Sequence, residues 1–345
     1  MTARTSAAPS VSNPIRAFRR APASRKRRVA GLLLVALLTL AISACASSSA
    51  PASSQSAPVA GNRLKVVATT TIVGDVVRNI GGDAIDLTVM LPAGADPHGF
   101  EPAPTDIASV NRANAVFING LQLESFLTAM VENAGGDAKI VAVSDGITPI
   151  EGTEEHADEA NHDEQEAHGS SDPHTWTDPN NVIVWVDNIE RTLSELDPAD
   201  AGTFAANAAA YKAELQALDK WIREEVATIP EANRKLVTDH AVFGYFANRY
   251  GFQQTGAVIP GYSTLSEPSA QEIAGLEDTL RSLAVNAIFV GNTVNNALSQ
   301  RVADDTGVRI VPVYTGSLSE ADGPAATYLD YMRYNVNAFV SALAN

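Results

Sequence analysis

Short β-rich runs alternate with helical patterns in two separate parts of the chain. In the first part, strands are expected at 64–70, 85–90, 115–119 and 139–143, and helices near 72–80, 105–114 and 124–133. In the second part, strands are expected at 235–238, 254–258, 287–290 and 309–314, and helices near 242–250, 268–283, 297–306 and 327–343. Strands that alternate with helices favour a parallel sheet covered by helices. The sequence therefore predicts an α/β fold with two similar lobes, each a mainly parallel four-stranded sheet.

Two further helices are expected between these parts, and each follows an Asp-Pro pair. Asp178-Pro179 should begin the first and Asp197-Pro198 the second, because aspartate is a good N-cap and proline fits the first helical turn. The second helix should run from about 199 to 228, which is roughly 45 Å at 1.5 Å per residue. We expect it to be a long rigid linking helix between the lobes, not a flexible hinge.

The first 45 residues differ from the rest in charge. They hold eight of the 24 basic residues and no acidic residue. An uncharged run over 29–44 is shorter than the about 20 apolar residues of a membrane-spanning helix and is typical of an export signal. It ends at Cys45, the only cysteine, in a context that resembles the bacterial lipobox. We expect a lipoprotein signal peptide over 1–45 with Cys45 lipidated; an ordinary signal peptide that contains a cysteine is the alternative.

The remaining chain divides by composition. Residues 46–61 are rich in Ser, Ala and Pro and should form a flexible tether. We then expect an N-terminal lobe over 62–182, a helical linker over 183–230 and a C-terminal lobe over 231–345. Beyond residue 45 the chain carries 16 basic and 40 acidic residues, a net charge of −24. So acidic a surface repels nucleic acid, so no nucleic-acid partner is expected. One cysteine allows no intrachain disulfide.

The chain has only six histidines, and their positions predict a metal site. His156, His162 and His168 lie in the acidic stretch 151–173, which has little to bury and should be a mobile loop. The other three, His98, His174 and His240, lie beside turn-forming or acidic residues, and two of them end Asp-Pro-His triplets. The neighbours Asp96, Asp172 and Asp239 are placed to orient the imidazoles, as is common for metal-bound histidines. Neutral imidazoles suit zinc and other late transition metals.

Three motifs resemble the signatures of zinc/manganese solute-binding proteins of ABC importers, the cluster A-I type. They are the segments 96–106 (DPHGFEPAPTD), 172–180 (DPHTWTDPN) and 238–246 (TDHAVFGYF). The segments 266–269 (SEPS) and 328–336 (YLDYMRYNV) fit as well, and the resemblance covers about residues 62–345. It implies two similar α/β lobes, a linking helix and one metal ion between the lobes. It also implies delivery of that ion to an ABC permease with its ATPase.

The resemblance assigns site residues by position. His98 and His174 match the metal ligands of the first lobe, and His240 matches the first ligand of the second lobe. Glu320 takes the place of an Asp that many relatives carry in the loop after the last strand, and Asp322 nearby is the alternative. Because zinc-binding relatives carry a His-rich loop where this chain has its acidic loop, His156, His162 and His168 are expected to be accessory metal collectors.

Several functions remain open at this point. A lipid-anchored, extracytoplasmic zinc receptor acting as a monomer is favoured, because three imidazoles and one carboxylate suit Zn²⁺ better than Mn²⁺. A manganese receptor of the same class is the alternative. A zinc hydrolase would need an open coordination position for water, with Glu320 as general base, but the chain has no His-Glu-x-x-His helix. We therefore expect no enzyme; a role in cell adhesion stays open as a second function.

Overall fold

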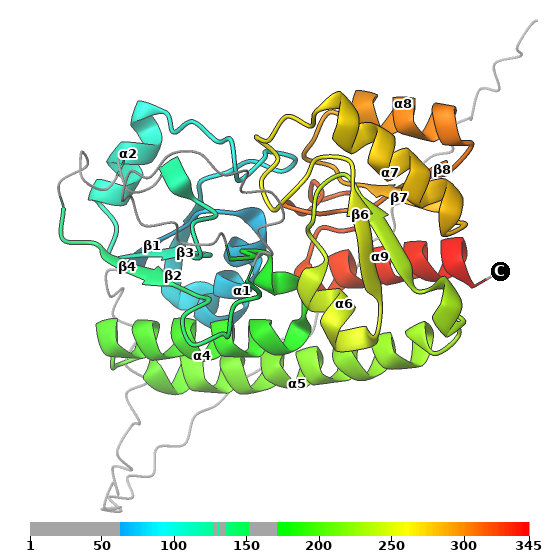
Figure 1. Ribbon diagram of the computed structural model, residues 1–345. Helices are drawn as coiled ribbons and strands as arrows, with labels where there is room; N and C mark the ends of the chain where they lie inside the picture. Colours follow the sequence, from blue (N-terminus) through cyan, green and yellow to red (C-terminus); the bar gives the residue numbers. More distant parts are fainter. Residues whose placement is uncertain (1–62, 127–129, 131–135, 152–170, 345) are drawn as a thin grey trace, which may run out of the picture. The chain divides into compact units, whose positions relative to one another are not determined.

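The computed structural model describes residues 63–126, 130, 136–151 and 171–344, which contain two four-stranded parallel sheets. The first sheet has the order β2-β1-β3-β4 and the second has the order β6-β5-β7-β8. The strands are β1 Leu64–Ala68, β2 Ile85–Val89, β3 Ala115–Ile118, β4 Lys139–Ala142, β5 Lys235–Thr238, β6 Gln253–Ala257, β7 Ala287–Val290 and β8 Arg309–Pro312. The two sheets repeat one topology, so the predicted two-lobed α/β fold is confirmed (Figure 1).

Helices follow the strands in each lobe, and two helices lie between the two sheets in the chain. The helices are α1 Thr71–Gly81, α2 Pro104–Asn111, α4 Pro179–Leu196, α5 Ala201–Val226, α6 Gly244–Tyr250, α7 Ala270–Ser282, α8 Ala297–Thr306 and α9 Tyr328–Leu343. The two between the sheets are α4 and α5. Short 3-10 turns occur at η1 Gly82–Ala84, η2 Thr175–Thr177 and η3 Glu231–Asn233. The first strand ends before Thr70, contrary to expectation, because the Thr70 side chain accepts the N–H of Val73 and caps α1.

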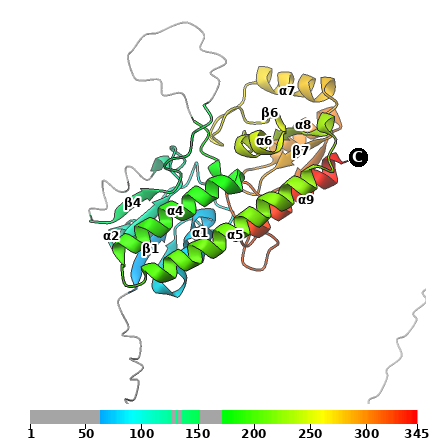
Figure 2. The ribbon, with the colours of Figure 1, turned by 90° about the horizontal axis from the view of Figure 1, so that it is seen from below.

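The helices α4 and α5 lie side by side, and α5 runs past both sheets (Figure 2). Asp178 caps α4 as predicted, since its carboxylate accepts the N–H of Asn180. The expected start of α5 was wrong by two residues: the helix begins at Ala201 after Asp200. The Asp197 carboxylate instead accepts the N–H of Ala199 in the preceding turn, so it caps a turn and not the helix.

One hydrophobic core extends through both lobes. It includes Val66 of β1 and Phe289 of β7, together with the buried stripe of α5. Phe339 of α9 lies against Phe289, with ring centroids 4.8 Å apart, and against Phe243 at 5.2 Å. Such aromatic pairs add about 0.5–1.5 kcal/mol each beyond the burial of their area. These pairs lie within the second lobe, whereas the core cluster contains residues of both sheets and of α5, so the lobes are joined by shared packing as well as by the covalent linker.

Some expectations fall on residues that the structure does not describe. Cys45 and the tether belong to the first 62 residues, and His156, His162 and His168 lie within 152–170. The predicted helix at 124–133 lies partly in such a segment as well. Within the described part of the chain, no helix combines the length and apolar character that a membrane crossing requires.

Candidate metal centre

His98 lies in the loop that follows β2, held by the carboxylate of Asp96. One oxygen of Asp96 accepts the backbone N–H of His98 at 3.0 Å, and the other accepts the hydroxyl of Thr264 at 2.5 Å. Asp96 was expected to orient the imidazole, but it fixes the loop backbone instead. Thr264 belongs to the second lobe, so this carboxylate also joins the two halves of the site.

His174 is held more completely, in the segment that leads into η2. Asp172 Oδ1 accepts both the backbone N–H of His174 at 2.9 Å and its ring Nδ1–H at 2.8 Å. Asp172 is 0% exposed and His174 is 1% exposed. As expected from the sequence, Asp172 orients this imidazole, and with Nδ1 occupied the lone pair of Nε2 is left for another partner.

The second lobe repeats this arrangement at the end of β5. Asp239 Oδ1 accepts the backbone N–H and the ring Nδ1–H of His240, both at 2.6 Å. The other oxygen of Asp239 accepts the N–H of Gly291, the residue after β7. Asp239 is thereby held by two neighbouring strands, and His240 by Asp239.

The three imidazoles meet between the lobes. The ring centroids lie 5.3 Å apart for His98 and His174, 5.6 Å for His98 and His240, and 5.1 Å for His174 and His240. One nitrogen from each ring lies within 4.8 Å of the others, and Nε2 of His98 is 3.2 Å from Nε2 of His174. A tetrahedral zinc ion with Zn–N bonds of about 2.0–2.1 Å needs nitrogens about 3.4 Å apart. The spacing therefore suits a zinc-sized ion.

Burial favours the neutral form of the His98 and His174 imidazoles. Desolvation, followed by the proximity of His174 and His240, lowers the pKa of His98 to about 3. Desolvation and then the charge of His240 hold the pKa of His174 well below its usual range. Desolvation also raises the pKa of Asp172 to about 7, against the opposing hydrogen bond from the His174 N–H. Neutral rings carry the lone pairs that metal coordination requires.

The assignment of Glu320 as the fourth ligand has to be corrected. Its side chain is exposed and does not join the histidine cluster, and Asp322 is exposed as well. The loop after β8 instead approaches the cluster at Gly316, where an added Cβ would lie 2.8 Å from Cδ of Pro97. Residues directly after a parallel strand lie at the edge where ligands bind. Glu320 lies eight residues beyond Pro312, the last residue of β8, and distance from the strand end was the signal that could have excluded it.

The environment of the cluster includes Trp176, which the sequence assigns to packing beside the site. Its ring lies against His174, with ring centroids 5.2 Å apart. Its Nε1–H points to the Thr315 carbonyl at 3.2 Å and to the Tyr331 hydroxyl at 3.1 Å, both in the second lobe. Trp176 is thus a packing residue and also a polar link between the lobes beside the site.

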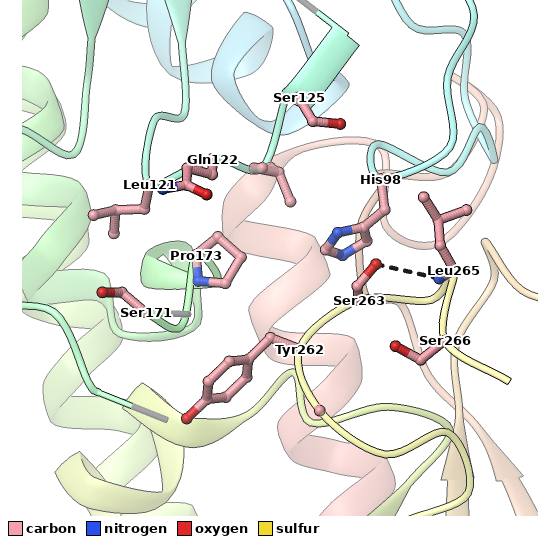
Figure 3. A pocket seen from close by; sticks show the side chains of 12 residues that line it. His98, Leu121, Gln122, Ser125, Ser171, Pro173, Tyr262, Ser263, Leu265 and Ser266 are labelled. Carbon is pink, nitrogen blue, oxygen red and sulfur yellow. Dashed lines mark hydrogen bonds between the residues drawn. The ribbon is translucent and has the colours of Figure 1, made fainter. Parts of the chain in front are cut away.

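A cavity of about 360 Å³ opens in front of His98 (Figure 3). Residues from both lobes line it, among them Leu121, Gln122, Ser125, Tyr262 and Leu265. None of these residues was singled out from the sequence, since no local pattern marks them. The cavity gives the histidine cluster access from outside.

Comparison with known proteins agrees with this architecture. Residues 66–342 match the family described as zinc-uptake complex component A, periplasmic. The manganese-binding lipoprotein MntA of Halalkalibacterium halodurans is 37% identical over 287 residues, which cover 82% of this chain and 90% of that protein. The metal ABC transporter substrate-binding lipoprotein SsaB of Streptococcus sanguinis is 35% identical over 322 residues, covering 91% of this chain and 97% of that protein.

Solved structures share the fold. The periplasmic zinc binding protein TroA from Treponema pallidum has a TM-score of 0.73 at 26% identity, covering 82% of this chain and 100% of that one. A Mn-bound periplasmic metal binding protein from Candidatus Liberibacter asiaticus has a TM-score of 0.70 at 26% identity, covering 81% and 99%. The chain therefore belongs to the family of zinc-uptake complex component A, the substrate-binding receptors of metal ABC transporters.

Proposed function

We propose that this receptor captures Zn²⁺ through His98, His174 and His240 and delivers it to a membrane permease driven by an ATPase. The observation that carries the proposal is the donor set: two buried imidazoles and one half-buried imidazole come together, and no carboxylate joins them within the described residues. Zinc is borderline-soft and accepts nitrogen ligands readily, whereas Mn²⁺ prefers oxygen donors and is the weakest-bound ion of the divalent first-row series.

Manganese is the second candidate, and the names of relatives favour it. MntA of Halalkalibacterium halodurans is named manganese-binding, and PsaA of Streptococcus pneumoniae is named a manganese ABC transporter lipoprotein. A manganese ion in this cluster would have to take most of its oxygen donors from water. The nitrogen donor set therefore weighs more for this chain than the names of its relatives.

A hydrolase is not supported. Three histidines leave a coordination position for water, but the reaction also needs a base near that water. The one base candidate from the sequence, Glu320, is exposed and outside the cluster.

The anchor and the remaining boundaries are part of this proposal. We assign lipidation to Cys45, a tether to 46–61, lobes to 62–182 and 231–345, and a linker to 183–230. Relatives named lipoproteins support the anchor and an extracytoplasmic location, since two or more acyl chains hold a protein stably at a membrane. His156, His162 and His168 are proposed to be accessory zinc collectors, and the receptor is proposed to be monomeric.

Competitive binding of zinc and manganese at pH 7.5 tests the proposal. Metal-free wild type should take up one tightly bound ion and prefer zinc by about 10³-fold or more. Changing His240→Glu should reduce that preference by about tenfold or more, because a carboxylate makes the site harder. Gln271→Glu adds the same charge at an exposed position of α7 and should change nothing.

Two results would contradict the proposal. Wild type that prefers manganese would show that the donor set was misjudged. A preference that His240→Glu leaves unchanged would show that His240 does not bind the metal.

A further inference from the structure

The cavity in front of His98 is in reach of all three histidines. His98 itself lines it, and so does Pro173, the neighbour of His174. Gly261 also lines it, and its carbonyl accepts the N–H of Ala241, the residue after His240, at 3.0 Å. An ion held by the cluster would therefore face this cavity with its remaining coordination positions.

One wall of the cavity is a strained turn after β3. Gly120, Leu121 and Gln122 all have positive φ angles, of 90°, 53° and 63°, although this region disfavours residues with side chains. Such conformations persist only where the surroundings enforce them, and they concentrate at ligand-binding sites.

A buried carboxylate enforces this turn. Glu124 is 5% exposed, and its Oε1 accepts the hydroxyl of Thr69 and the N–H of Asn119, both at 2.7 Å. Its Oε2 accepts the N–H of Gly120 at 3.2 Å. The Asn119 side chain donates to the Pro173 carbonyl at 2.9 Å, which connects the turn to the His174 segment. The hydrogen bonds of Glu124 and Asn119 thus hold Leu121 and Gln122 in front of the cluster. None of these hydrogen bonds is made to the imidazole rings of the three histidines.

The chemistry of the lining suits a small chelating ligand. Among the described residues, those that line the cavity apart from His98 are hydroxyl, amide, apolar and glycine residues, and none of them is Asp, Glu, Lys or Arg. Zinc held by three neutral imidazoles keeps both positive charges, and it can expand from four to five ligands. A ligand with one carboxylate and one adjacent hydroxyl or amine would supply two donor atoms and offset part of that charge.

We propose that this cavity binds a small α-hydroxy- or α-aminocarboxylate that completes the coordination of the zinc ion held by the histidine cluster. The inference rests on the proposed function and specifies its substrate: a zinc chelate in addition to the bare ion. A hydrated ion alone would need neither the strained turn nor the apolar wall of Leu121 and Leu265. In the complex, hydroxyl groups such as those of Ser125 and Tyr262 would hydrogen-bond the ligand.

Cobalt substitution tests this proposal, because Co²⁺ reports its coordination number in its visible spectrum. The metal-free protein is loaded with one Co²⁺ and titrated with L-lactate or glycine, which are weak chelators. Propionate is the matched control, since it has the carboxylate but lacks the second donor. Lactate and glycine should weaken the visible bands as four-coordinate cobalt becomes five-coordinate, and propionate should not.

Variants that fill the cavity locate the effect. Ser125→Phe and Ser266→Phe, both at the cavity wall, should raise the lactate concentration for half-maximal change by about tenfold. Ser282→Phe, at the exposed end of α7, should behave as wild type. A spectrum that lactate and glycine leave unchanged, or that responds equally in the filled variants, overturns this inference. A protein that fails to bind cobalt at all refutes the proposed function itself.

Discussion

Two segments with the same three residues, Asp96-Pro97-His98 and Asp172-Pro173-His174, hold their histidines in different ways. Both carboxylates accept the backbone N–H of the histidine. Only Asp172 also accepts the ring N–H, whereas the second oxygen of Asp96 accepts the Thr264 hydroxyl. Asp172 is fully buried, and its Oδ1 accepts both N–H groups while its Oδ2 has no hydrogen-bond partner among the described residues. The same triplet therefore supports two hydrogen-bond patterns, so the local sequence does not decide whether the carboxylate reaches the imidazole.

His98 also differs from His240, because a carboxylate accepts the ring N–H of His240 but not that of His98. His240 shares with His174 a carboxylate on its Nδ1, although its aspartate precedes it by one residue and not by two. His98 is half-buried, whereas the other two are 1% exposed. The cluster therefore combines two firmly oriented imidazoles with one that lies at the cavity.

The largest effect should come from removing an oriented imidazole. His174→Ala should lower zinc affinity by at least about 10³-fold, since changes to the partners of a ligand alone cost 10–100-fold. His98→Ala should lose clearly less, because this ring is less firmly oriented in the free protein. Competition with a chromogenic chelator measures both. Equal losses would contradict the distinction between the two triplets.

Replacing Asp172 should lower zinc affinity more than replacing Asp96. Asp172→Asn should cost about 10–100-fold in zinc affinity, because it weakens the bond that orients the His174 ring. Asp96→Asn should cost less than about threefold, since that carboxylate contacts the backbone and Thr264 but not the ring. The same chelator assay decides between them. A larger loss for Asp96→Asn would refute our account of the two segments.

The pH dependence of zinc affinity should follow the titration of one group, the Asp172 carboxyl. Asp172, with its pKa raised to about 7, holds a proton in the metal-free protein below that pH, and the proton must leave before His174 can bind zinc beside an ionised carboxylate. Protons compete for His98 only near its pKa of about 3. Between pH 7 and 5.5 zinc affinity should therefore fall by about 15-fold, with a slope that approaches one proton per ion below pH 7.

Isothermal titration in two buffers of different ionisation enthalpy counts the protons released. Asp172→Asn should flatten the dependence, and Asp96→Asn should leave it as in wild type. A slope clearly above one would contradict this prediction, because it would show that groups other than Asp172 release protons when zinc binds.

The smallest effect is expected for Trp176→Phe, which removes the Nε1–H that links the His174 segment to Thr315 and Tyr331. Zinc affinity should fall by about fivefold, equivalent to about 1 kcal/mol for one lost hydrogen bond. Trp185→Phe is the matched control, because the Nε1–H of Trp185 in α4 bonds Ser144 of the first lobe and makes no link to the second lobe. Both variants should lose similar stability in chemical denaturation, but only Trp176→Phe should change affinity.

Local features of the fold followed from the sequence. The strands β5 and β7 and the helix α8 have the predicted bounds, because apolar periodicity and turn residues act within a few positions of the chain. Asp178 was correctly assigned as the cap of α4. Asp197 was not a helix cap, although it carries the same Asp-Pro signal, because its carboxylate stabilises a turn that ends before Ala201.

The sequence by itself determined that the chain folds into two α/β lobes and carries three histidines outside its acidic loop. Only the tertiary structure decided that these histidines meet without Glu320, that Asp172 reaches its ring while Asp96 does not, and that Leu121 and Gln122 wall a cavity beside them. The reason is physical. The patterns that indicate helices and strands involve near neighbours in the chain, whereas this metal site joins loops as far apart as residues 98 and 240, whose distances and burial depend on how the two lobes pack.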